Sequence, residues 1–83
     1  MYPNDVLSPP ADFSKASLEG WFAAIRFAAL DYPPNSPQRQ RFLDEAARKV
    51  NYAAFLGRKK RGAVAMLKEQ AARLPGLLST HGH

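Results

Sequence analysis

Residues 36–62 read SPQRQRFLDEAARKVNYAAFLGRKKRG, and this stretch decides the fold. It opens with a strong helix-start signal, because Ser36 offers an N-cap oxygen and Pro37 suits the first helical position, where no N–H is needed. Gly57 is a suitable C-terminal stop. Between them, apolar residues recur at helical spacing on one face: Phe42, Leu43, Ala46, Ala47, Val50, Ala53 and Ala54. The stretch therefore predicts a helix over 37–56. Near its C-terminal end the apolar face is widened by Tyr52, Phe55 and Leu56.

The opposite face of this helix carries charged residues four positions apart, in the pairs Arg41–Glu45, Asp44–Arg48 and Glu45–Lys49. We expect them to form surface salt bridges, each contributing about 0.3 kcal/mol to helix stability. Asp44 and Glu45 are neighbours in sequence and point about 100° apart on a helix, so they do not form a paired acid and base.

After Gly57, four basic residues interrupt the helical spacing of apolar residues. The spacing resumes in a predicted third helix over 62–74. Its inward positions are Val64, Leu67, Ala71 and Leu74. Pro75 and Gly76 end it and begin a tail over 75–83. An alternative is one bent helix over 37–74, with Gly57 and Gly62 inside it at about 1 kcal/mol each.

Before Ser36, residues 31–35 (DYPPN) end an earlier helix, predicted over 14–31 and capped by Asp12 or Ser14. Its polar residues Lys15, Glu19 and Arg26 lie on one narrow stripe, and the rest of 18–30 is apolar or small. Such a helix is expected at the centre of the domain or against another chain. Residues 1–13 form an irregular, proline-containing leader, which these side chains would pin to the helices: Tyr2, Val6, Leu7 and Phe13.

These elements predict one all-α domain over 1–83, a small three-helix bundle with an irregular leader. The chain contains no cysteine and no Cys/His cluster, so we expect neither disulfide, structural metal nor cofactor. A core this small gains from oligomerisation or from docking on a larger partner. The apolar stretch 18–30 is too short to span a bilayer, and the first residues lack the basic region of a signal peptide. We therefore expect a cytoplasmic protein without a membrane partner.

Charge is distributed unevenly along the chain, whose net charge is +5. Residues 1–35 hold two basic and four acidic residues, a net −2, whereas residues 36–83 hold ten basic and three acidic residues, a net +7. This asymmetry indicates a basic working half joined to a packing half.

The basic half centres on four consecutive residues, Arg58, Lys59, Lys60 and Arg61. So much unpaired charge cannot be buried in a chain this short, so it faces water or a negatively charged partner. Three interpretations stay open: contact with nucleic acid or a nucleoprotein complex, docking on an acidic protein surface, and solubility alone. Other basic residues would extend the footprint if the fold brings them together: Arg48, Lys49 and Lys68, and further Arg39, Arg41 and Arg73.

Catalytic patterns are absent, so we expect no enzyme. The two histidines, His81 and His83, lie in the last three residues, and no nucleophile has a base fixed beside it. Gly57 and Gly62 lack the neighbouring sequence of a phosphate-binding loop. In this chain the basic residues 58–61 form the connection between two predicted helices, which differs from the tight turn of a helix-turn-helix. We therefore expect phosphate contact without base-specific recognition.

Aromatic residues at core spacing are expected to pack inside rather than to stack on bases: Trp21, Phe22, Phe27, Phe42 and Phe55. Tyr32 and Tyr52 are better candidates for a contact surface. The alternative to nucleic-acid binding is an adaptor or inhibitor of the kind that phage and plasmid genes encode. Its protein interface, or a contact between copies of the chain, would include Trp21, Phe22, Phe27 and Tyr52.

Overall fold

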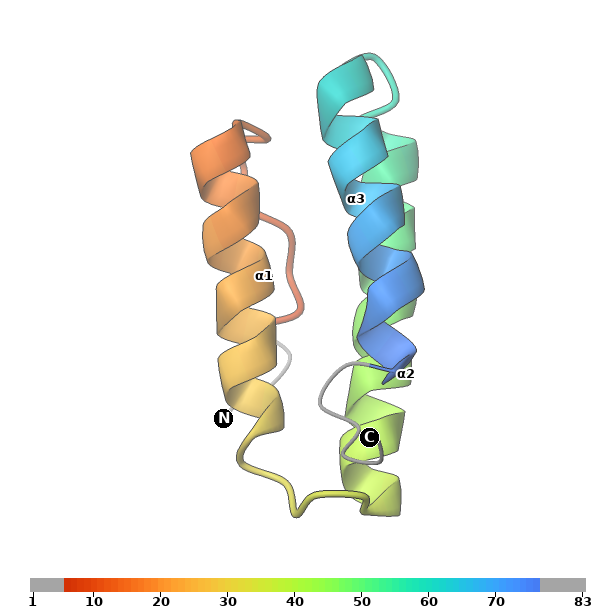
Figure 1. Cartoon of the computed structure of the whole chain (residues 1–83). Helices are drawn as coiled ribbons and strands as arrows, with labels where there is room; N and C mark the ends of the chain where they lie inside the picture. The colour runs from red at the N-terminus through yellow and green to blue at the C-terminus, as the bar shows by residue number, and fades with distance from the viewer. Residues whose placement is uncertain (1–5, 77–83) are drawn as a thin grey trace.

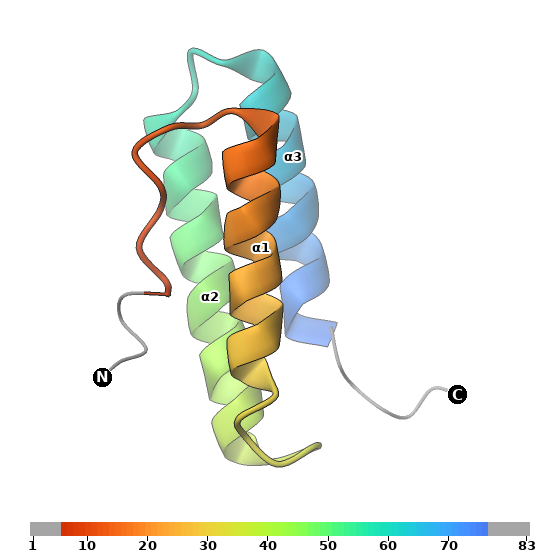
Figure 2. The same ribbon diagram turned by 90° about the vertical axis from the view of Figure 1, so that its left-hand side faces the viewer.

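Three α-helices run alternately up and down in the computed structural model, which describes residues 6–76 (Figures 1 and 2). Helix α1 spans Lys15–Ala29, α2 spans Pro37–Leu56 and α3 spans Arg61–Arg73, and the short 3-10 helix η1 follows at Leu74–Gly76. No strand occurs in residues 6–76. The predicted all-α three-helix fold is confirmed. The alternative of one bent helix is wrong, because residues 57–60 leave helical geometry.

Two serines begin the first two helices, as the sequence predicts. The Ser14 hydroxyl oxygen accepts the N–H of Ser17 at 3.2 Å, and the Ser36 hydroxyl oxygen accepts the N–H of Arg39 at 3.1 Å. Helix α2 matches the predicted bounds, with Pro37 in its first turn. Helix α1 ends two residues before the predicted end, and α3 is shifted by one residue toward the N-terminus.

The connection between α1 and α2 is fixed by a buried arginine. Arg39 is only 8% exposed, and its guanidinium donates from Nε to the Ala29 carbonyl at 3.1 Å and from Nη2 to the Tyr32 carbonyl at 2.8 Å. Ala29 is the last residue of α1 and Tyr32 lies in the segment that follows, so the guanidinium is placed at the C-terminal end of the helix, where a positive charge is favourable. Arg39 is therefore a cap for α1, and its expected place in an extended basic surface is wrong.

The core lies where the three helices meet, and α2 and α3 form the most extensive helix pair. Both helices of this pair bury small side chains, which permit a close approach of neighbouring backbones: Ala46, Ala53 and Ala54 on α2, and Ala63 and Ala71 on α3. Helix α1 lies against both helices and buries one face, which carries Leu18, Trp21, Phe22, Ile25 and Ala29. The expectation of a central α1 is wrong, because its opposite face is exposed.

The described part of the leader, residues 6–13, is irregular and packs alongside α1 and α2, as Figure 2 shows. The Trp21 indole N–H donates to the Val6 carbonyl at 2.8 Å, and Leu7 is buried in the core. Phe13 contributes a half-buried ring. The leader is thus attached by the residues expected to attach it, apart from Tyr2, which lies outside the described residues, as do His81 and His83 in the predicted tail.

Candidate functional site

The basic turn, residues 58–61, connects α2 to α3 at the end of the bundle where α1 begins (Figures 1 and 2). The N–H of Lys60 closes it by donating to the Gly57 carbonyl at 2.9 Å, and Arg61 is already the first residue of α3. All four basic side chains are exposed. Within residues 6–76, none of the four forms a salt bridge. The turn therefore presents concentrated positive charge to solvent.

One acidic residue, Asp12, lies close to this charge. Its carboxylate accepts the N–H of Ser14 at 3.2 Å and the hydroxyl of Ser17 at 3.2 Å. The pKa of Asp12 is lowered, mainly by the side chains of Ser14 and Ser17 and to a smaller degree by the charge of Lys60. Asp12 thus serves chiefly to cap α1, and it offsets only a small part of the charge in the basic turn.

Helix α3 begins without a side-chain cap, in contrast to α1 and α2. Its N-cap residue is Lys60, which makes no capping hydrogen bond. The first N–H groups of α3 consequently point out beside the basic turn with no side-chain acceptor. Backbone donors and the positive end of the helix dipole add to the attraction of this end for an anion.

Two exposed aromatic rings adjoin the basic turn, on the last turns of α2. Tyr52 is 58% exposed and Phe55 is 59% exposed, and their ring centroids lie 6.3 Å apart with planes 24° from parallel. The Arg58 guanidinium lies 4.6 Å from the centroid of Phe55 and also donates to the Phe55 carbonyl at 3.0 Å. We call Tyr52, Phe55 and Arg58 the stacked row. The expectation that Phe55 packs in the core is wrong, because more than half of its side chain is exposed to solvent.

An open hollow separates the leader from the basic turn. It is lined by Ala11, Asp12, Phe13, Leu56, Gly57, Arg58, Lys59 and Lys60. Gly57 ends α2 with φ −95°, a conformation open to any residue, so backbone freedom does not explain the glycine. The explanation is the Phe13 ring, since a Cβ at position 57 would lie 2.5 Å from the Phe13 Cδ2. The Phe13 ring therefore packs the leader against Gly57, the residue directly before the basic turn.

Three basic residues outside the turn, Arg48, Lys49 and Lys68, differ in how much charge they add near it. Arg48, Tyr52 and Phe55 follow steps of four and three on α2, so they share one face of the helix. Arg48 and Lys49 both pair with Glu45, Lys49 at 3.9 Å, which reduces their net charge. Of the three predicted pairs on α2, only Glu45–Lys49 forms. Lys68 is exposed on α3, about 10 Å along the helix from Arg61.

The four candidate interface residues divide into two groups. Trp21 and Phe22 are buried, at 7% and 5% exposure, and offer no surface to a partner. Phe27 is 76% exposed, so its expected place in the core is wrong, and Tyr52 belongs to the stacked row. Phe27 lies on an exposed, uncharged face of α1 made of Ala16, Gly20, Ala23, Phe27 and Leu30.

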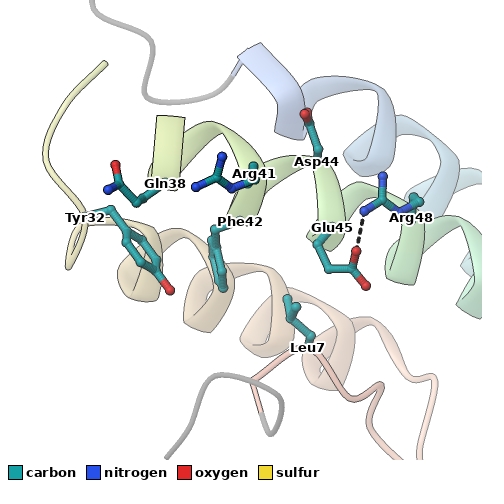
Figure 3. A pocket seen from close by; sticks show the side chains of 8 residues that line it. All are labelled: Leu7, Tyr32, Gln38, Arg41, Phe42, Asp44, Glu45 and Arg48. Carbon is teal, nitrogen blue, oxygen red and sulfur yellow. Dashed lines mark hydrogen bonds and ion pairs between the residues drawn. The ribbon is translucent and has the colours of Figure 1, made fainter. Parts of the chain in front are cut away.

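A groove of about 520 Å³ lies over the first half of α2, shown in Figure 3. Leu7, Tyr32 and Phe42 form its apolar part, with the Tyr32 and Phe42 rings 5.4 Å apart. Its rim mixes charges of both signs, and in Figure 3 the side chains of Asp44 and Glu45 point to different sides. The groove therefore contains no paired carboxylates for acid–base catalysis.

Residues 6–76 contain no group of three or more His, Cys, Asp or Glu side chains placed to hold a metal ion. Among the same residues, every helix is too short or too polar to cross a membrane. No protein-family model, curated protein or solved structure matches this chain.

Proposed function

We propose that this protein is a non-enzymatic binding protein that contacts nucleic acid, free or in a nucleoprotein complex, through the basic turn. The observation that carries the proposal is the exposure of Arg58, Lys59, Lys60 and Arg61 on one short turn, with no acidic partner within 4 Å among residues 6–76. Side chains of this type bind phosphate groups and release counterions, which supplies most of non-specific nucleic-acid affinity.

The geometry favours phosphate contact over recognition of base sequence. The charges lie on a turn between antiparallel helices, whereas a helix-turn-helix crosses its helices at about 90–120° and contacts bases with its second helix. Phosphate contacts position a protein on nucleic acid without carrying sequence information. If the four side chains each engage a phosphate of duplex DNA, log K falls with log salt at a slope of about −3.6.

Fluorescence anisotropy with labelled nucleic acid tests the proposal. We expect binding that weakens with salt, and we expect its loss when Arg58, Lys59, Lys60 and Arg61 are all replaced by Gln. The matched control replaces Arg48 and Lys49 by Gln, because these two residues are already paired with Glu45. This control should lose much less affinity. A folded wild-type protein that binds no nucleic acid at low salt overturns the proposal.

A second candidate function is docking on an acidic protein surface, and the exposed Phe27 and Leu30 favour it. These side chains are 76% and 55% exposed on the uncharged face of α1. Polyglutamate, an acidic polymer without bases, serves as the probe for this alternative. Equal affinity for polyglutamate and nucleic acid at matched charge would favour an acidic protein partner. A marked preference for nucleic acid would exclude an acidic protein as the main ligand of the basic turn.

A further inference from the structure

The stacked row gives the nucleic-acid proposal a more specific form. We propose that the preferred ligand is single-stranded nucleic acid, whose bases stack on Tyr52 and Phe55 while its phosphates contact the basic turn. This inference rests on the proposed function, and it adds a class of ligand that the basic turn alone does not select.

The first argument is the exposure of the rings. Helix α2 buries small residues between them, since Ala53 and Ala54 are 0% and 3% exposed, while Tyr52 and Phe55 keep more than half of their surface in solvent. The exposed part of two adjacent rings contributes nothing to folding, whereas adjacent exposed apolar groups are typical of binding surfaces. Their planes are 24° from parallel and their centroids are 6.3 Å apart, so the rings form a stacked pair whose exposed aromatic surface is of the kind on which bases stack.

The second argument is the place of Arg58 at the junction of rings and charge. Its guanidinium is held twice, by the ring of Phe55 at 4.6 Å and by the Phe55 carbonyl at 3.0 Å. A guanidinium in this position both extends the stacking surface and offers donors to a phosphate. Stacking and phosphate contact thus lie within one helical turn of each other, as successive parts of one strand require.

The third argument distinguishes single strands from duplexes. In a duplex the faces of the bases are covered by their neighbours, so exposed rings gain contact only where bases are unstacked. Phosphate contacts with the basic turn are available in both forms. The rings should therefore add affinity for the single strand alone, by about 1–3 kcal/mol per stacked base, or roughly fivefold to 150-fold.

The test compares a labelled strand of about 20 nucleotides, a length above common site sizes, with the duplex made from the same strand. The variant is Tyr52→Gln with Phe55→Gln, which removes both rings at exposed helical positions. We expect wild type to prefer the strand, and the variant to lose at least about tenfold in strand affinity. Its duplex affinity and its salt slope should stay unchanged, because the four basic charges remain.

Two controls isolate the rings. Phe27→Gln removes an exposed aromatic ring from α1, away from the basic turn, and should leave both affinities unchanged. The exchange Tyr52→Phe with Phe55→Tyr keeps both rings and should retain the preference for the strand. Circular dichroism at 222 nm checks that each variant keeps the helical content of wild type.

The outcomes separate this inference from the proposed function. Wild type that binds strand and duplex equally, with no effect of Tyr52→Gln and Phe55→Gln, overturns the stacking role and leaves the basic turn as a phosphate site. An equal loss for strand and duplex in the variant also overturns it. Wild type that binds neither form at low salt overturns both proposals.

Discussion

The two ends of the bundle use arginine in opposite ways. At the connection between α1 and α2, Arg39 is buried, and its guanidinium donates to the backbone carbonyls of Ala29 and Tyr32. At the connection between α2 and α3, Arg58 is exposed and lies on an exposed ring. A buried charge requires hydrogen-bond partners from the fold, whereas an exposed charge is free to recruit a partner from outside. The comparison assigns a structural role to the buried arginine at one end, and it leaves the charge at the other end available for the binding that we propose.

The largest expected effect comes from Arg39→Met, which removes the buried guanidinium from the connection between α1 and α2. Methionine fills much of the same volume but removes the guanidinium donors to the carbonyls of Ala29 and Tyr32. We expect the free energy of unfolding to fall by about 2–4 kcal/mol, because two hydrogen bonds from a charged group are lost. Urea denaturation measures this loss. A change below about 0.5 kcal/mol would show that Arg39 does not hold α1 to α2.

The next effect concerns the two glycines that flank the basic turn. Gly57→Ala places a Cβ against the Phe13 ring, at 2.5 Å before relaxation, and we expect a loss of about 1–2 kcal/mol in unfolding free energy. Gly62→Ala is the matched control, because its Cβ meets nothing within 4 Å and lies in the first turn of α3. Alanine there should stabilise by up to about 1 kcal/mol. Thermal unfolding measures the stability of both variants. If Gly57→Ala and Gly62→Ala change the stability in the same direction, the Phe13 ring does not require a glycine at position 57.

A smaller stability effect sharpens the comparison at the basic turn itself. Replacing Arg58, Lys59, Lys60 and Arg61 by Gln removes four charges, yet we expect the unfolding free energy to change by no more than about 0.5 kcal/mol. Exposed side chains without salt bridges contribute little to stability. One arginine at the other end should therefore matter more to the fold than all four here. A large loss in urea denaturation would assign the basic turn a structural role.

The smallest effect is expected from Asp12 and appears only in acid. Its pKa in the folded protein is lowered from the ordinary value of 3.8 by its hydrogen bonds to Ser14 and Ser17. The ionised carboxylate thus contributes stability above about pH 4, and that contribution is lost as the pH falls below 3.8. Asp12→Asn should flatten the acid limb of a plot of unfolding free energy against pH. An unchanged acid limb would exclude Asp12 from the N-terminal cap of α1.

Much of the fold follows from local signals in the sequence. The bounds of α2 are predicted correctly because Ser36 and Pro37 begin it and Gly57 ends it. Helix α3 has no side-chain cap, and its predicted start is one residue late. The reason for Gly57 was not predictable from local propensity, because the Phe13 ring that excludes a Cβ belongs to a segment more than forty positions earlier in the chain.

The candidate site was predicted in part. The exposure of residues 58–61 follows from their charge, but the placement of Phe55 and Phe27 was wrong, because apolar character alone does not show which face meets another helix. A signal for Arg39 was present and was overlooked. Arg39, Leu43, Ala46 and Val50 follow one helical stripe, so the arginine lies in phase with the core of α2. A basic residue in phase with a core stripe, next to a preceding helix end, predicts a buried cap.

The short connection between α2 and α3 also has a consequence for the order of folding. Only four residues separate these helices, and they form the most extensive helix pair of the bundle, so many of their contacts join residues that are near in the chain. Local contacts of this kind favour fast folding. We therefore expect the α2–α3 hairpin to form early and α1 to dock on it later, with Arg39 completing the joint when the end of α1 arrives.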